Sequence, residues 1–241
     1  MMSSREAFLA RVRQALHTGQ QSHHAEPARA GNREVVSLVT EGEDLAARLQ
    51  RELEGVGGSV ARVRHSAEAT QYITRLAEEK GAEVVVRWQS DLLDTLEIDD
   101  ALQAGGANVH AASPASEAEA ADRRQELREL LARADLGLSG VDAVIAETGT
   151  LMLTARPGQM RGVSLLPPVH IAVARIDQIV ATFADALRTA RQAGEDVQHN
   201  LTSCISFVTG PSRTGDIELK LTVGVHGPGE LHLVLLDEPG A

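Results

Sequence analysis

The sequence predicts one large α/β domain built on an open, mostly parallel sheet with flanking helices. From residue 34 onward, apolar residues alternate between helical and strand spacing, which is the pattern of strands joined by crossover helices. The valines at 84–86 form a short β-branched run of the kind found in strands buried on both faces. A length of 241 residues suits one large domain, or one domain with an appendage, better than two domains.

Residues 1–33 are the predicted appendage. Five arginines against two glutamates leave this segment at +3 and the rest of the chain at -14. Ser3 and Ser4 can cap a short helix whose apolar residues share one face, and residues 17–33 have the composition of a linker. An arginine-rich, acid-poor start also resembles a transit peptide, and this alternative stays open. The expected organisation is an amphipathic helix and linker over 1–33, followed by a domain over 34–241.

The first half of the domain shows two helical stripes and two strands. The leucines between 45 and 53 form a stripe that ends in glycines, and residues 60–63 then suggest a strand. Ser66 precedes a second stripe, which Gly81 closes where a left-handed C-terminal residue is wanted. The strand at 84–86 follows this helix.

The second half begins with a capping box, Ser116 and Glu119, at the start of the next helix. Further apolar runs predict strands at 141–146, 151–153, 169–174, 204–208 and 231–236. A long amphipathic helix is expected over 176–187. Thr148 and Gly149, between two apolar runs, could turn a local hairpin, so we expect at least one antiparallel strand.

Composition excludes several classes of protein. No window is apolar for long enough to span a membrane. The net charge of -11 and only five aromatic residues argue against a nucleic-acid partner. The single cysteine, Cys204, can form no internal disulfide and cannot hold an iron–sulfur cluster, which ordinarily takes four thiolates. A cytoplasmic location is therefore expected, and any cluster chemistry is expected in another chain.

Two loops carry the strongest functional signals, because ligands of open α/β sheets bind beyond the carboxyl ends of the strands. The loop after 141–146 offers a carboxylate, two hydroxyls and a glycine that lets a ligand approach the backbone: Glu147, Thr148, Gly149 and Thr150. The loop after 204–208 offers hydroxyls, an arginine fork and an acid: Thr209, Gly210, Ser212, Arg213, Thr214 and Asp216. We expect both loops to open on the same sheet edge. The alternative is that both are ordinary hydroxyl-rich turns.

Five other residues are weaker candidates. His170 begins an apolar run, where a histidine is more often a satisfied core residue than an acid–base catalyst. His226 lies in a glycine-rich turn before the last strand, and His232 within that strand is expected to face solvent or a helix. Cys204 is expected to be a buried, inert thiol. Trp88 could wall the crevice but is expected to pack against a helix.

Three segments together resemble the LUD family, in its lactate utilisation protein C branch: 143–151 (AVIAETGTL), 209–218 (TGPSRTGDIE) and 224–228 (GVHGP). The resemblance is ordered along the chain and covers the domain from about residue 34 to the C-terminus. Gly215 stands where the family pattern has alanine, which bears only on the stiffness of that loop. The resemblance implies a Rossmann-like fold similar to the NagB/RpiA/CoA-transferase-like group.

The same resemblance implies a role in oxidising L-lactate to pyruvate beside two iron–sulfur proteins, the A-type and B-type lactate utilisation proteins. In that reading this chain carries no cofactor, and it binds a small carboxylate or organises its cluster-bearing partners. The alternative is a free-standing enzyme acting on a small anionic metabolite, a sugar phosphate or an acyl-CoA. The sequence shows no P-loop, dinucleotide fingerprint, nucleophile elbow or zinc-binding helix motif, and no obvious nucleophile–base pair, which favours the first reading.

Within the two loops, Arg213 is the natural partner of a carboxylate or phosphate, because a guanidinium can bond two oxygens at once. The hydroxyls expected at the edges of the ligand are those of Thr148, Thr150, Ser212 and Thr214. Glu147 is assigned to the hydroxyl side of a 2-hydroxy acid, and Asp216 to orienting Arg213. The alternative is a loop clasp in which Arg213 pairs with Asp216 or Glu218.

Overall fold

The computed structural model describes residues 5, 8–15, 38–112, 122–195, 204–215 and 221–238. The chain divides into two compact units, Met1–Val36 and Ser37–Ala241. In the first unit, residues 8–15 are helical and Phe8 and Val12 are exposed. The predicted linker, the predicted capping box at Ser116 and Glu119, and Asp216 lie outside the described residues.

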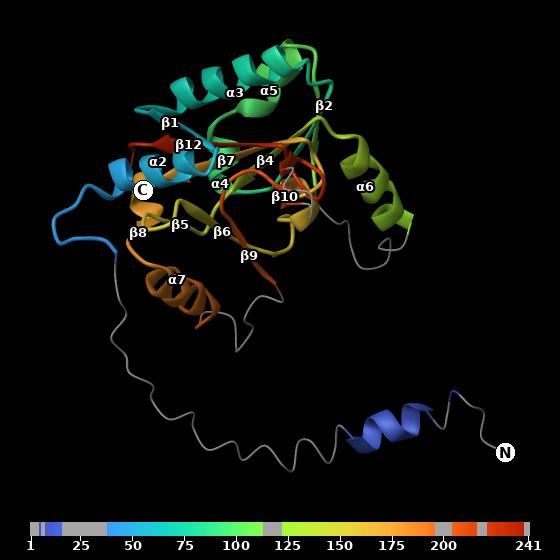
Figure 1. Cartoon of the computed structure of the whole chain (residues 1–241). Coiled ribbons are helices and arrows are strands. Elements are labelled where there is room, and N and C mark those ends of the chain that lie inside the picture. The colour runs from blue at the N-terminus through green and yellow to red at the C-terminus, as the bar shows by residue number, and fades with distance from the viewer. Residues whose placement is uncertain are drawn as a thin grey trace. The chain divides into compact units, whose positions relative to one another are not determined.

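Six parallel strands form the main sheet of the second unit (Figure 1). In spatial order they are β1 (Ser59–Val63), β12 (Glu230–Leu236), β7 (Val169–Arg175), β4 (Leu136–Gly140), β2 (Val84–Arg87) and β3 (Asn108–Ala111). All five neighbouring pairs run parallel. The prediction of a mostly parallel α/β sheet is therefore confirmed, and β1, β2, β7 and β12 match predicted runs.

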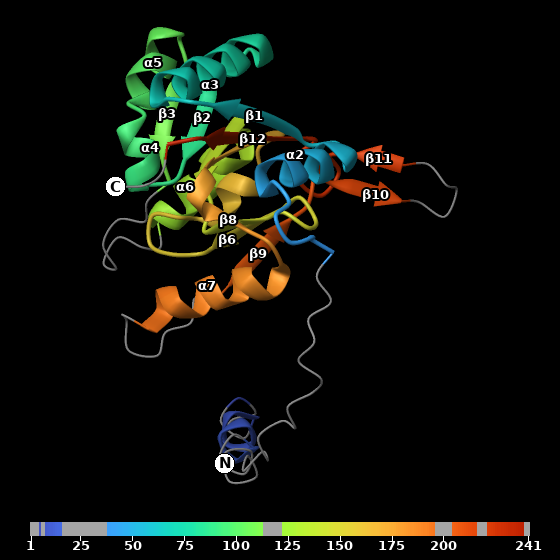
Figure 2. The ribbon, with the colours of Figure 1, turned by 90° about the vertical axis from the view of Figure 1, so that its left-hand side faces the viewer.

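Helices cover both faces of this sheet. Figures 1 and 2 show α3 (Ser66–Lys80) and α5 (Ile98–Ala104) together on one face. On the other side, α2 (Leu45–Gly55) packs beside β1, and α6 (Asp122–Arg133) contacts β2. The short α4 (Asp91–Thr95) contacts β4. The sequence patterns predicted α2, α3 and α6, but not α4, α5 or β3.

Local sequence explains the start of one predicted helix of the first half and the end of the other. The Asp44 carboxylate caps α2 by accepting hydrogen bonds from the N–H groups of Ala46 and Ala47. Gly81 ends α3 in the left-handed conformation with φ 61°, as predicted. The start of α2 and the end of α3 therefore follow from residues close together in the sequence.

A second, four-stranded sheet lies on the face opposite α3 (Figure 1). Its order is β8 (Ile179–Val180), β5 (Ala143–Ile145), β6 (Thr150–Thr154) and β9 (Ile205–Val208), and β6 runs antiparallel to β5 and β9. The predicted hairpin at Thr148 and Gly149 is confirmed. The runs at 141–146 and 204–208 belong to this sheet, so the expectation of a single sheet is wrong. Separately, β10 (Arg213–Gly215) pairs antiparallel with β11 (Leu221–Val223).

The long helix predicted over 176–187 is also wrong. Residues Ile176–Gln178 form a 3₁₀ turn, η3, and the next two pair with β5 as β8. A new helix, α7, runs over Phe183–Glu195 and covers the outer side of the second sheet (Figures 1 and 2). The β-branched residues Ile179 and Val180 gain two strand pairings that a helix would forgo, which explains the break.

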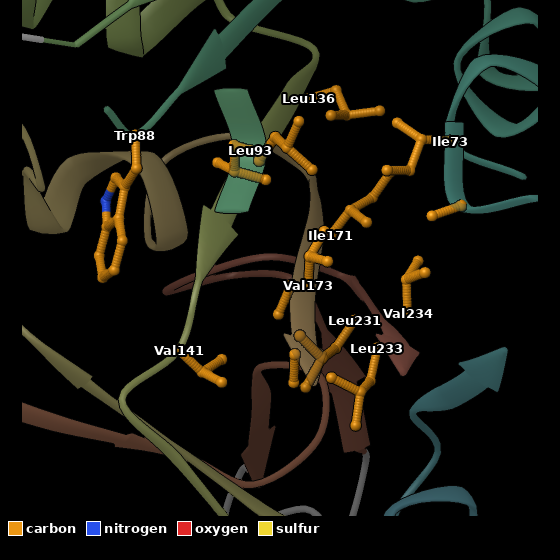
Figure 3. Close-up of a cluster of buried hydrophobic side chains, with 14 of the residues drawn as sticks. Ile73, Trp88, Leu93, Leu136, Val141, Ile171, Val173, Leu231, Leu233 and Val234 are labelled. Atoms are coloured by element: carbon orange, nitrogen blue, oxygen red, sulfur yellow. The ribbon is translucent and has the colours of Figure 1, made fainter. Parts of the chain in front are cut away.

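The core surrounds the main sheet. Figure 3 shows Ile171 and Val173 of β7 at the centre of this cluster, with Ile73 of α3 on one side of it. Trp88, just past β2, exposes only 2% of its surface and donates its indole N–H to the Met160 carbonyl at 2.9 Å. The carboxyl end of β2 is therefore held against the loop that precedes the 3₁₀ turn η2 (Arg161–Ser164).

Candidate functional site

The two predicted loops meet at one edge of the second sheet. Since β5 and β9 are both antiparallel to β6, they run in the same direction and end on the same side. There the hydroxyl of Thr150 hydrogen-bonds with those of Thr148 and Thr209, at 2.7 Å each. We call these three groups the hydroxyl chain. Thr150 is buried, whereas Thr148 and Thr209 are exposed.

The C-terminal end of α2 packs against this edge. Gly149, with φ 64°, faces the backbone of Leu53, and Gly210, with φ 78°, faces the carbonyl oxygen of Val56. A side chain on either glycine would collide with helix backbone. The two glycines therefore make room for α2, and the approach to the backbone that we expected Gly149 to offer a ligand is filled by the helix.

The Glu147 carboxylate has a structural bond that the sequence did not predict. Its Oε1 accepts a hydrogen bond of 2.9 Å from the backbone N–H of Phe183, the first residue of α7. A carboxylate at this point satisfies an N–H that has no partner within the helix and interacts favourably with the helix dipole. Glu147 thus ties the loop of the hydroxyl chain to α7.

Arg213 opens β10 and has an exposed side chain. Its Nη2 lies over Gly57, which has φ 88° and follows the C-terminal end of α2. A cation is favourable near a helix C-terminus, because the last carbonyl groups carry partial negative charge. Asp216 and Glu218, the partners of the alternative loop clasp, lie outside the described residues.

A glycine-rich turn lies beside the second loop. The N–H of Ser212 donates to the Pro228 carbonyl at 2.8 Å, and its own carbonyl accepts from Gly224 at 2.9 Å. His226 in this turn is exposed, and Thr214 on β10 is half-buried. The turn leads directly into β12, so the turn and the second loop beside it lie at the amino edge of the main sheet. We call Glu147, the hydroxyl chain and Arg213 the amino-edge cluster.

His170 is not brought to this cluster. It lies inside the main sheet on β7, fully buried, with Nε2 2.8 Å from the Ser139 hydroxyl of β4. Burial lowers the pKa of His170 from 6.5 to about 4, with a smaller contribution from the nearby His232. His232 faces α3, where its Nδ1 lies 3.1 Å from the Tyr72 hydroxyl. A neutral His170 therefore forms a buried polar pair with Ser139.

A second candidate site lies at the carboxyl edge of the main sheet. The chain leaves β2 for β3 on one side and leaves β4 for β7 on the other, so the winding reverses between β2 and β4. Ligands of open α/β sheets bind at such a reversal. A hollow of about 370 Å³ lies there, within the range of roughly 300–1,000 Å³ typical of small-molecule sites. We call it the carboxyl-edge hollow.

The lining of this hollow comes from residues after β2, β4 and β7 and from the loop after β6. Its polar members include Ser90, Asp142, Arg156, Gln159, Arg175 and Gln178. Asp142 is fully bonded: Oδ1 pairs with Arg156 at 2.8 Å, and Oδ2 accepts from the N–H and hydroxyl of Thr154 at 2.7 and 2.9 Å. Gln178 bonds the backbone of Val141 and Arg175 through its amide.

The sequence patterns missed this hollow because they missed β4. Leu136 and Leu138 alternate with Gly137, Ser139 and Gly140, and small residues of this kind indicate turns when only neighbours in sequence are considered. Alternation of leucines with small residues was the available signal. Trp88, which we expected to wall a crevice or pack against a helix, lines this hollow from the end of β2.

The described residues provide neither a metal site nor a membrane-spanning helix. Among the described residues, no three or more His, Cys, Asp or Glu side chains gather in a way that could hold a metal ion. None of the described helices combines the length and apolar character needed to cross a membrane. Cys204 is half-buried, and not fully buried as expected, with its sulfur 3.5 Å from Nη1 of Arg161.

Comparison with protein families gives a match over most of the chain. The model described as LUD domain matches residues 46–236, a span that includes both sheets, the amino-edge cluster and the carboxyl-edge hollow. The match therefore concerns the second unit as a whole.

Curated proteins similar to this chain carry the name lactate utilization protein C. The one from Macrococcus caseolyticus is 42% identical over 106 residues, or 44% of this chain and 46% of that protein. The one from Halalkalibacterium halodurans is 32% identical over 158 residues, or 66% of this chain and 64% of that protein. The one from Bacillus subtilis is 35% identical over 120 residues, or 49% of each. The chain thus spans about half the length of most of these relatives.

A solved structure supports the fold alone. The crystal structure of a DUF162 family protein from Deinococcus radiodurans, at 1.70 Å resolution, is 22% identical and superposes with a TM-score of 0.52. The superposition covers 80% of this chain and 96% of that one.

Proposed function

Because this chain belongs to the LUD domain family, we propose that it serves in lactate utilisation as a non-redox component of an iron–sulfur-dependent system that oxidises L-lactate to pyruvate. The names of the curated relatives support the lactate utilisation role. In this proposal the chain binds a small carboxylate or organises its partners, which are iron–sulfur lactate utilisation proteins of the A and B type.

The non-redox part of the proposal rests on the donor groups of the sequence. An iron–sulfur cluster ordinarily takes four thiolates, and the chain has one cysteine. The sequence also lacks a dinucleotide fingerprint. Electrons from lactate therefore pass to clusters in the partner proteins.

The purified chain is expected to be colourless and to leave L-lactate unoxidised with any artificial electron acceptor. Absorbance spectra after anaerobic reconstitution with iron and sulfide, together with a pyruvate assay, check this. The matched control is the same assay with cluster-bearing partners added, where pyruvate should appear. A stoichiometric chromophore in the chain alone would contradict the proposal.

The observation that carries the binding role is the convergence of the two loops at the amino-edge cluster. The hydroxyl chain offers donors and acceptors on one side, and the exposed guanidinium of Arg213 offers two parallel donors for a carboxylate. In the proposal, Ser212 and Thr214 bond the edges of the ligand. Glu147 takes the substrate hydroxyl while its Oε1 stays on Phe183, and Asp216 orients Arg213.

Arg213→Ala is expected to weaken lactate or pyruvate binding about ten- to a hundred-fold, because a charge-assisted hydrogen bond contributes about 1.5 to 3 kcal/mol. Calorimetric titration of wild type and variant measures this. Arg51→Ala is the control: its side chain is 60% exposed on α2 and pairs with Glu43 and Glu52, so affinity should not change. A lower melting temperature with unchanged affinity would show that Arg213 is a loop clasp.

The second candidate function is a free-standing enzyme acting on a small anionic metabolite such as a sugar phosphate or an acyl-CoA. It is favoured by the carboxyl-edge hollow, which has the size of a small-molecule site and arginines in its lining. Affinity capture of the full chain separates the two functions. Stoichiometric recovery of cluster-bearing proteins supports the first, and turnover by the isolated chain supports the second.

A further inference from the structure

We propose that the carboxyl-edge hollow is a binding site for a small anion that carries a hydroxyl group, with Arg175 taking the anionic end and Gln159 accepting from the hydroxyl. This site is separate from the amino-edge cluster. The inference therefore stands or falls independently of the role proposed for Arg213.

Two buried polar atoms in the lining lack a hydrogen-bond partner among the described residues: Oε1 of Gln159 and Nε of Arg175. The carboxylate oxygen of Asp177 lies 3.8 Å from Nε, which is beyond hydrogen-bond distance. A buried polar atom without a partner is destabilising, and native structures hold few of them. That two occur in the lining of one hollow, on separate segments of the chain, points to a ligand that bonds both.

The charges around the hollow single out Arg175. Of the charged residues in the lining, Arg156 is paired with Asp142, whose other oxygen accepts from Thr154, and Asp91 lies in the first turn of α4. Within the described part of the chain, Arg175 is recorded beside the carboxylate of Asp177 at 3.8 Å, and its side chain is 34% exposed. Arg175 is thus the guanidinium that a ligand can reach with least competition.

The two atoms require opposite chemistry from a ligand. Nε of Arg175 is a donor and calls for an acceptor, which an anionic oxygen supplies best. Oε1 of Gln159 is an acceptor and calls for an O–H or N–H group. A 2-hydroxycarboxylate carries both groups on adjacent carbons, and a hydroxylated phosphate ester shares this chemistry. A 2-keto acid lacks the donor.

The location of the hollow supports the same reading. It lies at the reversal between β2 and β4, where open α/β sheets place their ligands. Gly140, the last residue of β4, leaves space in the hollow, because the nearest atom to a Cβ there would be the Ser90 hydroxyl oxygen at 3.7 Å. The end of β4 therefore leaves space beside the two unpaired atoms.

Titration of the full chain with L-lactate, pyruvate and glycerol 3-phosphate tests the site. L-lactate is expected to saturate a site that Arg213→Ala leaves intact, and to bind there more tightly than pyruvate does; Arg175→Ala should weaken binding at this site about ten- to a hundred-fold. Arg75→Ala is the control, since its side chain is 65% exposed on α3 and pairs with Glu79. Tighter binding of glycerol 3-phosphate than of L-lactate would identify the hydroxylated phosphate as the ligand. Absence of saturable binding of all three would overturn the proposal.

Gln159→Met separates binding from stability. The variant keeps the length of the side chain and removes the unpaired oxygen, so its melting temperature should be unchanged or higher. L-lactate should bind about three- to ten-fold more weakly, whereas pyruvate should bind as in wild type. A lower melting temperature with unchanged L-lactate affinity would show that Gln159 is satisfied internally, and would overturn the proposal. If Arg213→Ala abolishes all binding and Arg175→Ala none, the amino-edge cluster is the ligand site and this inference fails alone.

Discussion

Gly137→Ala is expected to destabilise the protein by about 3 kcal/mol or more, because the new Cβ would occupy the position of a backbone atom. Gly137 lies in β4, and a Cβ there would collide with the Val163 carbonyl oxygen and come within 3.1 Å of Cγ of Pro167. The two segments cannot move apart at low cost, since β4 is buried throughout and Val163 and Ser164 of η2 are buried as well. For a domain of this size the melting temperature should fall by roughly 6–12 °C.

Gly140→Ala, in the same strand, is the matched control for this prediction. Its new Cβ would meet only the Ser90 hydroxyl, at the ordinary contact distance of 3.7 Å. The melting temperature of this variant should stay near that of wild type. Equal melting temperatures for the two variants would contradict the close packing of η2 on β4.

Between pH 6.5 and pH 4, the free energy of unfolding is expected to fall by about 3 kcal/mol through His170 alone. Burial, and to a smaller extent His232, lowers the pKa of His170 to about 4 in the folded protein, against 6.5 in the unfolded chain. Between pH 6.5 and pH 4, His170 binds a proton in the unfolded chain but not in the folded protein. The stabilisation is therefore complete above pH 6.5 and is lost as the pH falls towards 4.

Denaturant unfolding at pH 7.5, 6.0 and 5.0 measures how steeply the free energy of unfolding falls with falling pH, and this steepness is the slope. His170→Gln should flatten it, since the amide does not titrate, even if the variant is less stable at every pH. His226→Gln is the control, because His226 is exposed in the turn before β12 and its loss should leave the slope unchanged. The pKa values of the carboxylates Glu43 and Glu230 are lowered from 4.5 by their hydrogen bonds, so the stability that they contribute is lost as the pH falls below about 4.5, which is below the lowest pH measured. A slope that survives in His170→Gln would refute the assignment.

Local sequence patterns predicted one of the two candidate sites and missed the other. The loops at Glu147 and Arg213 were predicted because each follows an apolar run, and the structure brings them together through Thr150 and Thr209. They lie at the amino edge of the main sheet, since the runs before them belong to the second sheet. The carboxyl-edge hollow escaped prediction because its position depends on the reversal between β2 and β4.

By itself the sequence determined the α/β class, the helical stripes over α2 and α3 with the end of α3 at Gly81, and the buried strands β2, β7 and β12. These features depend on residues close together in the chain, through side-chain periodicity, capping and β-branching. Only the tertiary structure decided that the run at 141–146 joins a second sheet, that β4 exists, and that Gln159 and Arg175 line one hollow. Strand pairing is set by contacts between distant segments, and the close approach of Val163 to Gly137 leaves no signal in the local pattern of either.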